Sequence, residues 1–239
     1  MAKRPAFFIG NDLNNEFVRI EEFDFNWYPG FSFTQKQKNV AEFHLSIHNK
    51  YPNYKILEIS SKSNERCGRD LSAFKLSFKY NNKLVSVESA FQSSKVFESG
   101  EQYEDLLERS SKEAKTDLRI KNGGKLKKFH FNNEDWELTP PTSFYDWLYI
   151  NALNESHNRE LAKHIMRYDC FTDIEFNPKK SFNCQARSAA LYKYLVKYNL
   201  FEKSLSKDNY LKLITHTFKM SKIIGNNMIQ GSLLTMKKL

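Results

Sequence analysis

Cysteine, glycine and proline are scarce in this sequence, and long apolar runs are absent. Three cysteines that are odd in number and widely spaced (Cys67, Cys170 and Cys184) exclude a disulfide framework and a zinc-binding pattern. Eight glycines and six prolines among 239 residues exclude a collagenous or low-complexity chain. No apolar run approaches the roughly 20 residues of a membrane-spanning helix, and the first residues lack a signal-peptide pattern. We therefore expect a soluble, cytoplasmic protein with no membrane partner.

Aromatic residues, by contrast, are abundant. The chain contains 20 Phe and 12 Tyr, and aromatic residues make up 15% of the sequence. So many large apolar rings can build a core, which excludes intrinsic disorder for most of the chain. The length of 239 residues suits one full domain, or one domain with a small appendage.

Positive charge is concentrated near the C-terminus. The net charge is +9, yet residues 178–239 hold 12 basic residues against only Glu202 and Asp208. A patch of this kind favours polyanions such as nucleic acid. Lysines that only keep helix surfaces soluble explain it equally well. If the partner is DNA, the expected phosphate contacts are Lys193, Lys197, Lys203 and Lys207.

The hydrophobic periodicity predicts an α+β fold weighted to helix. Strands are expected over 16–27 and 55–59, a hairpin over 73–85 with its turn at Asn81-Asn82, and a strand pair over 127–138 around Asn132-Asn133. Helices are expected over 35–48, 86–98, 102–119, 142–168 and 181–201. The segment 218–239 either docks as a helix or stays loose.

One predicted helix presents a polar face. At about 100° per residue, Glu88, Gln92 and Lys95 lie within roughly 60° of one another on the helix over 86–98. Val87 and Phe91 occupy another face, which suits a core. The polar face offers a carboxylate, an amide and an amine to a ligand, although an ordinary solvated face has the same composition.

Three other segments contain candidate binding groups. The loop Ser60-Ser61-Lys62-Ser63 offers hydroxyls, amides and an ammonium group to phosphate oxygens, or is ordinary surface. Tyr145 and Trp147 either stack on a base or pack in the core. The polar stretch 172–178 and the residues 183–187 that follow it are either functional or only cap a helix.

These segments resemble the NADAR family. The motifs LSAF (71–74) and SVESAFQSSK (86–95) are similar to its hallmark sequences, with Ala73 and Ser89 where many members have Asn and His. The DarT-associated NADAR antitoxin subfamily is more similar still over residues 3–205. Its blocks resemble WYPGFS (27–32), QKQK (35–38), EISSKS (58–63), FYDWLYINAL (144–153) and DIEFNPKKSFNCQARSAAL (173–191).

The resemblance implies a predominantly helical α+β domain over residues 1–205 with small antiparallel β elements. Residues 1–57 form a subfamily-specific strand and helix region, residues 58–205 form the catalytic core, and residues 206–239 form a basic extension of unknown structure. The implied activity is removal of ADP-ribose from guanine bases of DNA, as antitoxin to a DarT-type toxin that modifies DNA. ADP-ribosylated DNA is then the substrate, ADP-ribose a product, and neither a cofactor nor a metal is required.

Two other functions are compatible with the sequence. One is an N-glycosidase acting on a small ribosylated metabolite. The other is a non-catalytic module that binds ADP-ribose or the toxin. Glu88 on the same predicted face as Lys95 favours catalysis.

The resemblance also suggests roles for individual residues. Glu88 is the expected catalytic carboxylate and Asp173 the second candidate. Lys62 either binds phosphate or, as an alternative shared with Lys95, attacks the ribose C1 atom to form a Schiff base. The remaining expected ligand contacts are Ser61, Ser63, Ser72, Phe74, Gln92, Lys95, Tyr145, Trp147, Asn183 and Arg187.

Overall fold

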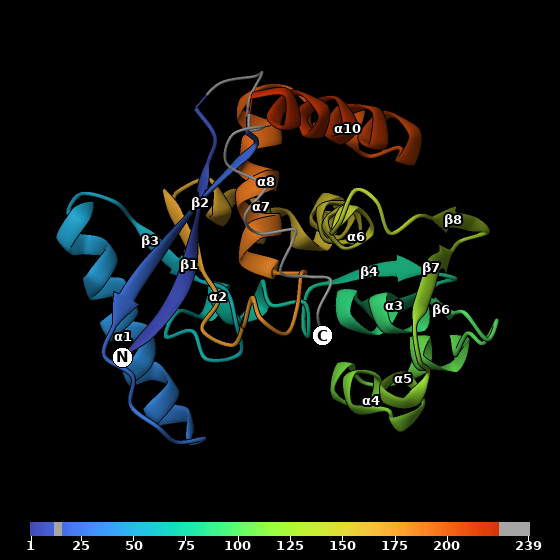
Figure 1. Ribbon diagram of the computed structural model, residues 1–239, viewed down its shortest axis with the longest axis horizontal. Helices are drawn as coiled ribbons and strands as arrows, with labels where there is room; N and C mark the ends of the chain where they lie inside the picture. Colours follow the sequence, from blue (N-terminus) through green and yellow to red (C-terminus); the bar gives the residue numbers. More distant parts are fainter. Residues whose placement is uncertain (12–15, 225–239) are drawn as a thin grey trace.

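The computed structural model describes residues 1–11 and 16–224, and the predicted α+β class is confirmed. Figure 1 shows a sheet of long strands beside α1, a layer of helices next to it, and a smaller lobe that contains α3, α4 and α5. The helices are α1 (Phe33–Lys50), α2 (Arg66–Asp70), α3 (Val87–Ser93), α4 (Ser111–Thr116), α5 (Leu118–Asn122), α6 (Ser143–Asn154), α7 (Arg159–Ile165), α8 (Gln185–Lys197), α9 (Phe201–Ser204) and α10 (Lys207–Ile224). Two 3₁₀ turns, η1 (Glu104–Glu108) and η2 (Ser156–Asn158), complete the helical elements described.

The largest sheet is buried on both faces. Its strand order is β2 (Val18–Phe25), β1 (Ala2–Ile9), β9 (Cys170–Thr172) and β3 (Ile56–Glu58), and only the pair formed by β3 and β9 is parallel. Side chains alternate along β1, so that Phe8 packs with α1 residues such as Phe43, whereas Phe7 faces the core to which α8 contributes. The sheet therefore brings β1, at the start of the chain, next to β9, which lies more than 150 residues later in the sequence.

Two asparagine turns close the smaller sheets. Asn81 and Asn82 join β4 (Ser77–Tyr80) to β5 (Lys83–Ser86), with φ angles of 48° and 62°. Asn132 and Asn133 join β7 (Leu126–Phe131) to β8 (Glu134–Trp136) in the same way, and β6 (Lys95–Phe97) pairs with β7. Asparagine tolerates the left-handed region better than other non-glycine residues. Both predicted turns are confirmed.

The helix predicted over 86–98 is wrong in its second half. α3 ends at Ser93, and Lys95 begins β6 by pairing with Phe129. The hydroxyls of Ser93 and Ser94 donate to the Ala90 carbonyl at 3.0 and 2.6 Å, which competes with continuation of the helix. Lys95 therefore does not lie on a helical face with Glu88.

Three other predicted helices are shorter than expected. The segment 102–119 contains η1, α4 and part of α5, and the segment 142–168 is divided at Glu155, whose backbone is extended. α8 begins at Gln185 and not at residue 181. Strands β1 and β9 were not predicted. The expected N-terminal strand over 16–27 is observed as β2.

The beginning of the expected C-terminal extension is helical and packs on the domain. Tyr210 of α10 is fully buried, and Trp147 Nε1 donates to the Leu205 carbonyl at 3.0 Å. Most of the segment 218–239 lies outside the described residues. None of the helices described is long and apolar enough to cross a membrane.

Candidate active site

α3 holds Glu88 in a buried position at its first turn. Ser86 caps this helix, because its hydroxyl accepts a hydrogen bond from the Ser89 amide at 3.0 Å. A carboxylate in the first turn also interacts favourably with the positive end of the helix dipole. Glu88 is only 3% exposed, and its amide donates to the Ala73 carbonyl at 2.9 Å. The segment that contains Phe74 therefore lies directly against the Glu88 turn.

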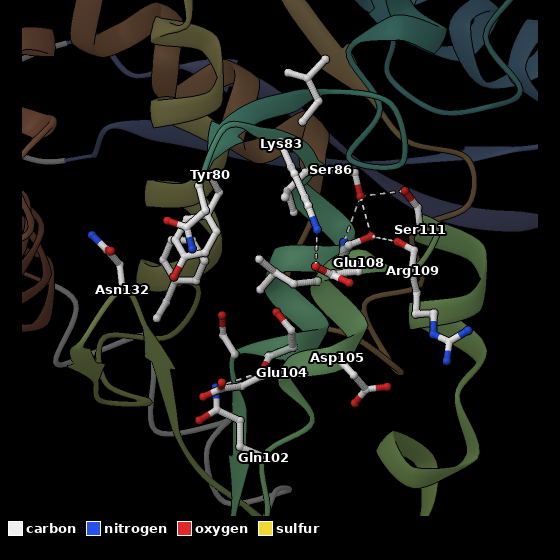
Figure 2. Close-up of a pocket in the computed structure, with 18 of the residues that line it drawn as sticks. Tyr80, Lys83, Ser86, Gln102, Glu104, Asp105, Glu108, Arg109, Ser111 and Asn132 are labelled. Atoms are coloured by element: carbon white, nitrogen blue, oxygen red, sulfur yellow. Dashed lines mark hydrogen bonds and ion pairs between the residues drawn. The ribbon is translucent and has the colours of Figure 1, made fainter.

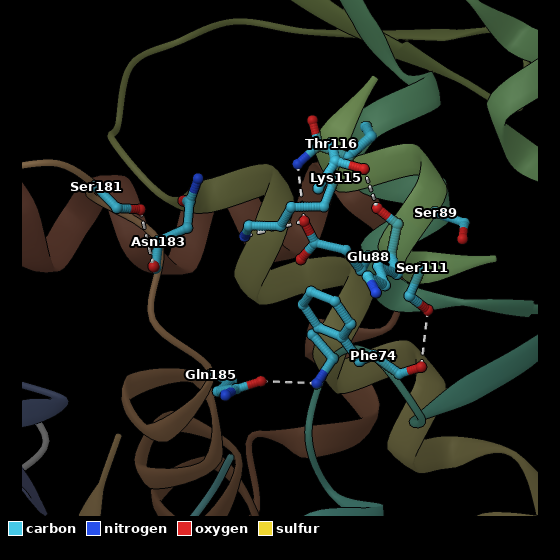
Figure 3. A network of polar contacts seen from close by, with 12 residues as sticks. Phe74, Glu88, Ser89, Ser111, Lys115, Thr116, Ser181, Asn183 and Gln185 are labelled. Atoms are coloured by element: carbon cyan, nitrogen blue, oxygen red, sulfur yellow. Dashed lines mark hydrogen bonds and ion pairs between the residues drawn. The ribbon is translucent and has the colours of Figure 1, made fainter. Parts of the chain in front are cut away.

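Two side chains contact the Glu88 carboxylate. Gln92 Nε2 donates to Glu88 Oε1 at 2.8 Å, and Lys115 Nζ of α4 lies 3.1 Å from the same oxygen. Figure 3 shows Lys115 and Phe74 beside this carboxylate. Since both contacts in the described part of the chain end on Oε1, Oε2 is the oxygen left to face a ligand.

Lys95 lies near Glu88 although it belongs to a strand. Its amine lies 5.1 Å from the centre of the Phe91 ring. Burial lowers the pKa of the Lys95 amine to about 8, against the opposing influence of the Glu88 charge. At pH 7 an amine with that pKa is unprotonated in about a tenth of the molecules. Lys95 is thus suited to nucleophilic attack.

Two buried polar atoms near this centre have no hydrogen-bond partner within the part of the chain that the structure describes. They are Ser72 Oγ and Gln92 Oε1, in residues that are 2% and 5% exposed. Leaving a buried polar atom unpaired costs about 1–3 kcal/mol. A ligand that supplied hydrogen-bond partners to these atoms would remove this cost, and ligand binding by Ser72 and Gln92 stays a prediction.

We predict that Ser72→Ala lowers ligand affinity without destabilising the protein. The substitution removes no hydrogen bond within the described chain, so the free energy of unfolding should stay the same or rise slightly. Affinity for ADP-ribose should fall by about two- to tenfold, the value of one hydrogen bond. Calorimetric titration with ADP-ribose, together with thermal unfolding, measures both quantities. Unchanged affinity would remove Ser72 from the site.

Asp173, the second predicted carboxylate, lies in a buried pair with Glu58. Glu58 is 2% exposed and accepts hydrogen bonds from Ser60 Oγ (2.6 Å), Thr172 Oγ1 (2.7 Å) and the Ile174 amide (2.9 Å). Burial raises the pKa of Glu58, and burial together with the neighbouring Glu58 raises the pKa of Asp173 well above its usual range. The raised pKa favours the protonated form of Asp173, which suits proton donation better than stabilisation of a cation.

Gln185 connects the segments around the site. Its side chain donates to the Ile59 carbonyl at 2.7 Å and accepts from the Ala73 amide at 2.7 Å. It also bonds the Asp173 carboxyl, and Figure 3 shows it next to Phe74. Tyr145 lies in the electrostatic influence of both Glu88 and Asp173, and burial raises its pKa far enough to keep the phenol neutral. The two predicted carboxylates thus belong to one continuous region.

In the loop Ser60-Ser61-Lys62-Ser63, called the serine loop below, Ser61 and Lys62 are the two residues that are not buried. Ser61 is exposed, and Lys62 Nζ lies 5.9 Å from the centre of the Phe33 ring. Ser63 is buried, and its hydroxyl accepts from the Glu65 amide at 3.2 Å while its carbonyl accepts from Arg69. Ser63 therefore shapes the loop, whereas Ser61 and Lys62 are free to meet a ligand.

Arg187 and Trp147 mainly support the fold. The Arg187 guanidinium donates to the Asp146 carboxylate, which is 2% exposed and also accepts from Ser188 Oγ at 2.6 Å. The Trp147 ring lies 4.9 Å from that of Trp136. Tyr145 is 6% exposed and belongs to the buried core, whereas Trp147 is partly buried and packs against that core. A ligand contact by Arg187 stays a prediction.

We predict that Arg187→Met destabilises the protein by about 3–5 kcal/mol, because it leaves the buried Asp146 charge unpaired. The double variant Arg187→Met/Asp146→Leu should be substantially more stable than the single variant, since it removes both charges. Urea unfolding measures the difference. If the double variant were as unstable as the single variant, lost packing and not the unpaired charge would account for the lower free energy of unfolding.

The lysines of the basic region 178–239 differ in whether their amines are free to bind phosphate. Lys193 is 9% exposed, and its amine donates to the Tyr168 carbonyl and lies 3.9 Å from Asp169. The expectation that Lys193 binds phosphate is therefore wrong, because its charge is already used within the fold. Lys197, by contrast, is exposed.

A cavity of about 1060 Å³ lies on the other side of α3. Figure 2 shows Ser86, Arg109 and three carboxylates around it. These carboxylates belong to Glu104, Asp105 and Glu108, and they outnumber the two cationic side chains of the lining, Lys83 and Arg109, which disfavours a pyrophosphate. None of the residues predicted to bind the ligand lines it. The region around Glu88 is therefore the better candidate for the active site.

Sequence comparison identifies the family of the chain. No curated protein shows a significant match to the chain. A comparison with protein families matches residues 2–223 to NADAR-DarT1, described as DarT1-associated NADAR antitoxin. The match continues past residue 205 and includes nearly all of α10. Since it spans almost the whole sequence, the chain belongs to the family of DarT1-associated NADAR antitoxins.

Proposed function

We propose that this antitoxin is a hydrolase that removes ADP-ribose from guanine bases of DNA. The observation that carries the proposal is a buried Glu88 carboxylate in the same region as a lysine amine whose pKa is about 8. This combination suits cleavage of the bond between C1 of a ribose and an exocyclic nitrogen. Because its substrate is cellular DNA, the protein would act in the cytoplasm.

Glu88 has the electrostatic role in this reaction. In the ring-opened substrate the protonated imine carries positive charge at C1 and its nitrogen, and a buried carboxylate stabilises that charge strongly. Burial also keeps water from screening the interaction. Lys115 and Gln92 fix the position of the carboxylate before the substrate arrives.

Lys95 has the covalent role. In the ring-opened form of the substrate, C1 is an imine carbon bonded to the guanine nitrogen. The neutral amine of Lys95 adds to C1, both of its protons pass to the guanine nitrogen, the guanine leaves as a primary amine, and a Schiff base between Lys95 and C1 remains. Water then adds to C1, and release of the lysine amine gives ADP-ribose. The two protons that the lysine nitrogen loses are the two that the guanine nitrogen gains, with the carboxyl group of the buried Asp173 as a candidate to relay them.

The phosphate groups require other side chains. Lys62 and Ser61 are the available amine and hydroxyl of the serine loop, and Ser72 has a buried hydroxyl without a partner in the described residues. Asn183 is a further candidate to contact a polar group of the ligand. These groups suit a pyrophosphate and its riboses.

A comparison of three substrates tests the proposal. They are an oligonucleotide with one ADP-ribosylated guanine, free ADP-ribosylated guanosine, and a small ribosylated amine without adenine. We expect release of ADP-ribose from the first two. Cleavage of the small amine alone would indicate a metabolic N-glycosidase. Tight binding of ADP-ribose without cleavage of any substrate would indicate a binding module.

A further inference from the structure

The exposed phenylalanine rings of the described residues are not scattered over the surface. Most phenylalanines are buried, but Phe31 is 97% exposed, Phe182 is 66% exposed, Phe33 is 46% exposed and Phe74 is 39% exposed. Isolated exposed apolar side chains need no explanation, whereas several gathered in one area mark an interaction surface.

Two of the rings lie beside residues of the candidate site, since Lys115 Nζ is 5.6 Å from the centre of the Phe74 ring and Lys62 Nζ is 5.9 Å from that of Phe33. Phe74 appears beside Glu88 in Figure 3, and Phe182 precedes Asn183, which the same figure shows bonded to Ser181. The loop that contains Phe182 is tied to α1 by an ion pair of 2.9 Å between Lys36 and Glu175. Phe31 and Phe33 lie at the N-terminal end of that helix. The rings thus extend from the Glu88 region, across the loop, to the start of α1.

Unpaired amines lie among these rings. Lys62 Nζ is 5.9 Å from the centre of the Phe33 ring, and Lys179 and Lys180 are exposed shortly before Phe182. None of these three lysines has an ion pair within the described residues, whereas Glu175 is already paired with Lys36. The surface therefore combines flat apolar rings with positive charge. This is the composition that binds single-stranded nucleic acid, since bases stack on rings and phosphates pair with amines.

We propose that Phe31, Phe33 and Phe182 form a stacking platform for the unmodified bases on either side of the modified guanine in single-stranded DNA. The proposal rests on the proposed function, because it assumes that the modified guanine belongs to a polynucleotide. A guanine that enters the Glu88 region must leave its base stack. Rings outside the site replace the stacking that its neighbours lose.

Substitutions that keep an apolar side chain but remove the ring test the platform. Binding of fluorescent, unmodified oligothymidine is measured by anisotropy for Phe31→Leu, Phe33→Leu and Phe182→Leu. Each leucine variant should bind about 5- to 100-fold more weakly, as expected for loss of one stacked base. The variant Phe182→Trp, which keeps an aromatic ring, should bind oligothymidine as tightly as the wild type or more tightly. The matched control is Leu84→Ala on β5, because Leu84 is 64% exposed and lies on the hairpin beside the acidic cavity.

A second measurement separates the platform from the chemistry. The leucine variants should raise KM for the modified oligonucleotide and leave hydrolysis of free ADP-ribosylated guanosine unchanged. If the wild type binds the strand through these rings but cleaves neither substrate, the platform stands and the proposed function fails. Binding of all three leucine variants at the wild-type level would overturn the platform. The platform would also be overturned if the leucine variants bound the strand normally but no longer bound the cognate toxin. That result would make this surface a protein interface.

Discussion

Glu88→Gln is expected to reduce release of ADP-ribose by about 100- to 1000-fold, the usual loss when a preorganised electrostatic contact to the transition state is removed. Glutamine keeps the size of the side chain and its bond with Gln92, but it does not balance positive charge at C1. Lys115 is 53% exposed, so its amine can be solvated when the carboxylate charge is lost, and the variant should remain folded. Single-turnover kinetics and thermal unfolding measure the two effects.

Glu98→Gln is the matched control for this substitution. Glu98 also forms an ion pair with a lysine, at 2.6 Å from Lys125, but its side chain is 54% exposed. We expect this variant to retain wild-type turnover, because an exposed ion pair contributes little. Near-normal turnover of a folded Glu88→Gln protein would exclude Glu88 as the catalytic carboxylate.

Lys95→Arg is expected to abolish turnover and covalent trapping together. Borohydride reduces a Schiff base to a stable amine, so wild-type protein treated during the reaction should gain the mass of ADP-ribose on Lys95. Arginine keeps the positive charge but has no nucleophilic amine at neutral pH. Lys62→Met is the control, because it should weaken substrate binding and still allow trapping. An adduct on Lys62, or normal hydrolysis without any adduct, would contradict the role given to Lys95.

The pH dependence follows from the same amine. Since burial lowers the pKa of Lys95 to about 8, the reactive neutral form becomes scarcer as the pH falls below that value. Single-turnover rates should therefore decrease about tenfold per pH unit between pH 7 and 6 and level off above about pH 8.5. A rate that is flat from pH 6 to 9 would show that deprotonation of Lys95 does not limit the reaction.

Local sequence patterns predicted part of this structure correctly. The asparagine turns and the polar face with Glu88 and Gln92 depend on residues that are close in the chain. The missed strand β1 contains Pro5, which argues against a strand within a sheet. Pro5 is tolerated because β9 pairs with β1 only at Phe7 and Phe8. β9 was missed because three buried residues give too short a pattern to recognise.

The candidate site was only partly predictable for a related reason. Lys95 was selected for a helical spacing that it does not have, and it lies near Glu88 because β6 continues directly from α3. Lys115, Gln185 and Glu58 come from segments far apart in the chain, so only tertiary packing brings them to the site. Gln185 stands within the polar motif between Asn183 and Arg187, which was the one available indication of its role.

The most direct test of the account is mass spectrometry of an oligonucleotide that contains one ADP-ribosylated guanine. The wild-type protein should convert it to the unmodified oligonucleotide and free ADP-ribose, with Glu98→Gln equally active and Glu88→Gln leaving the substrate intact. An unchanged substrate after incubation with folded wild-type protein, or equal conversion by the wild type and Glu88→Gln, would contradict the claim that the Glu88 region removes ADP-ribose from DNA.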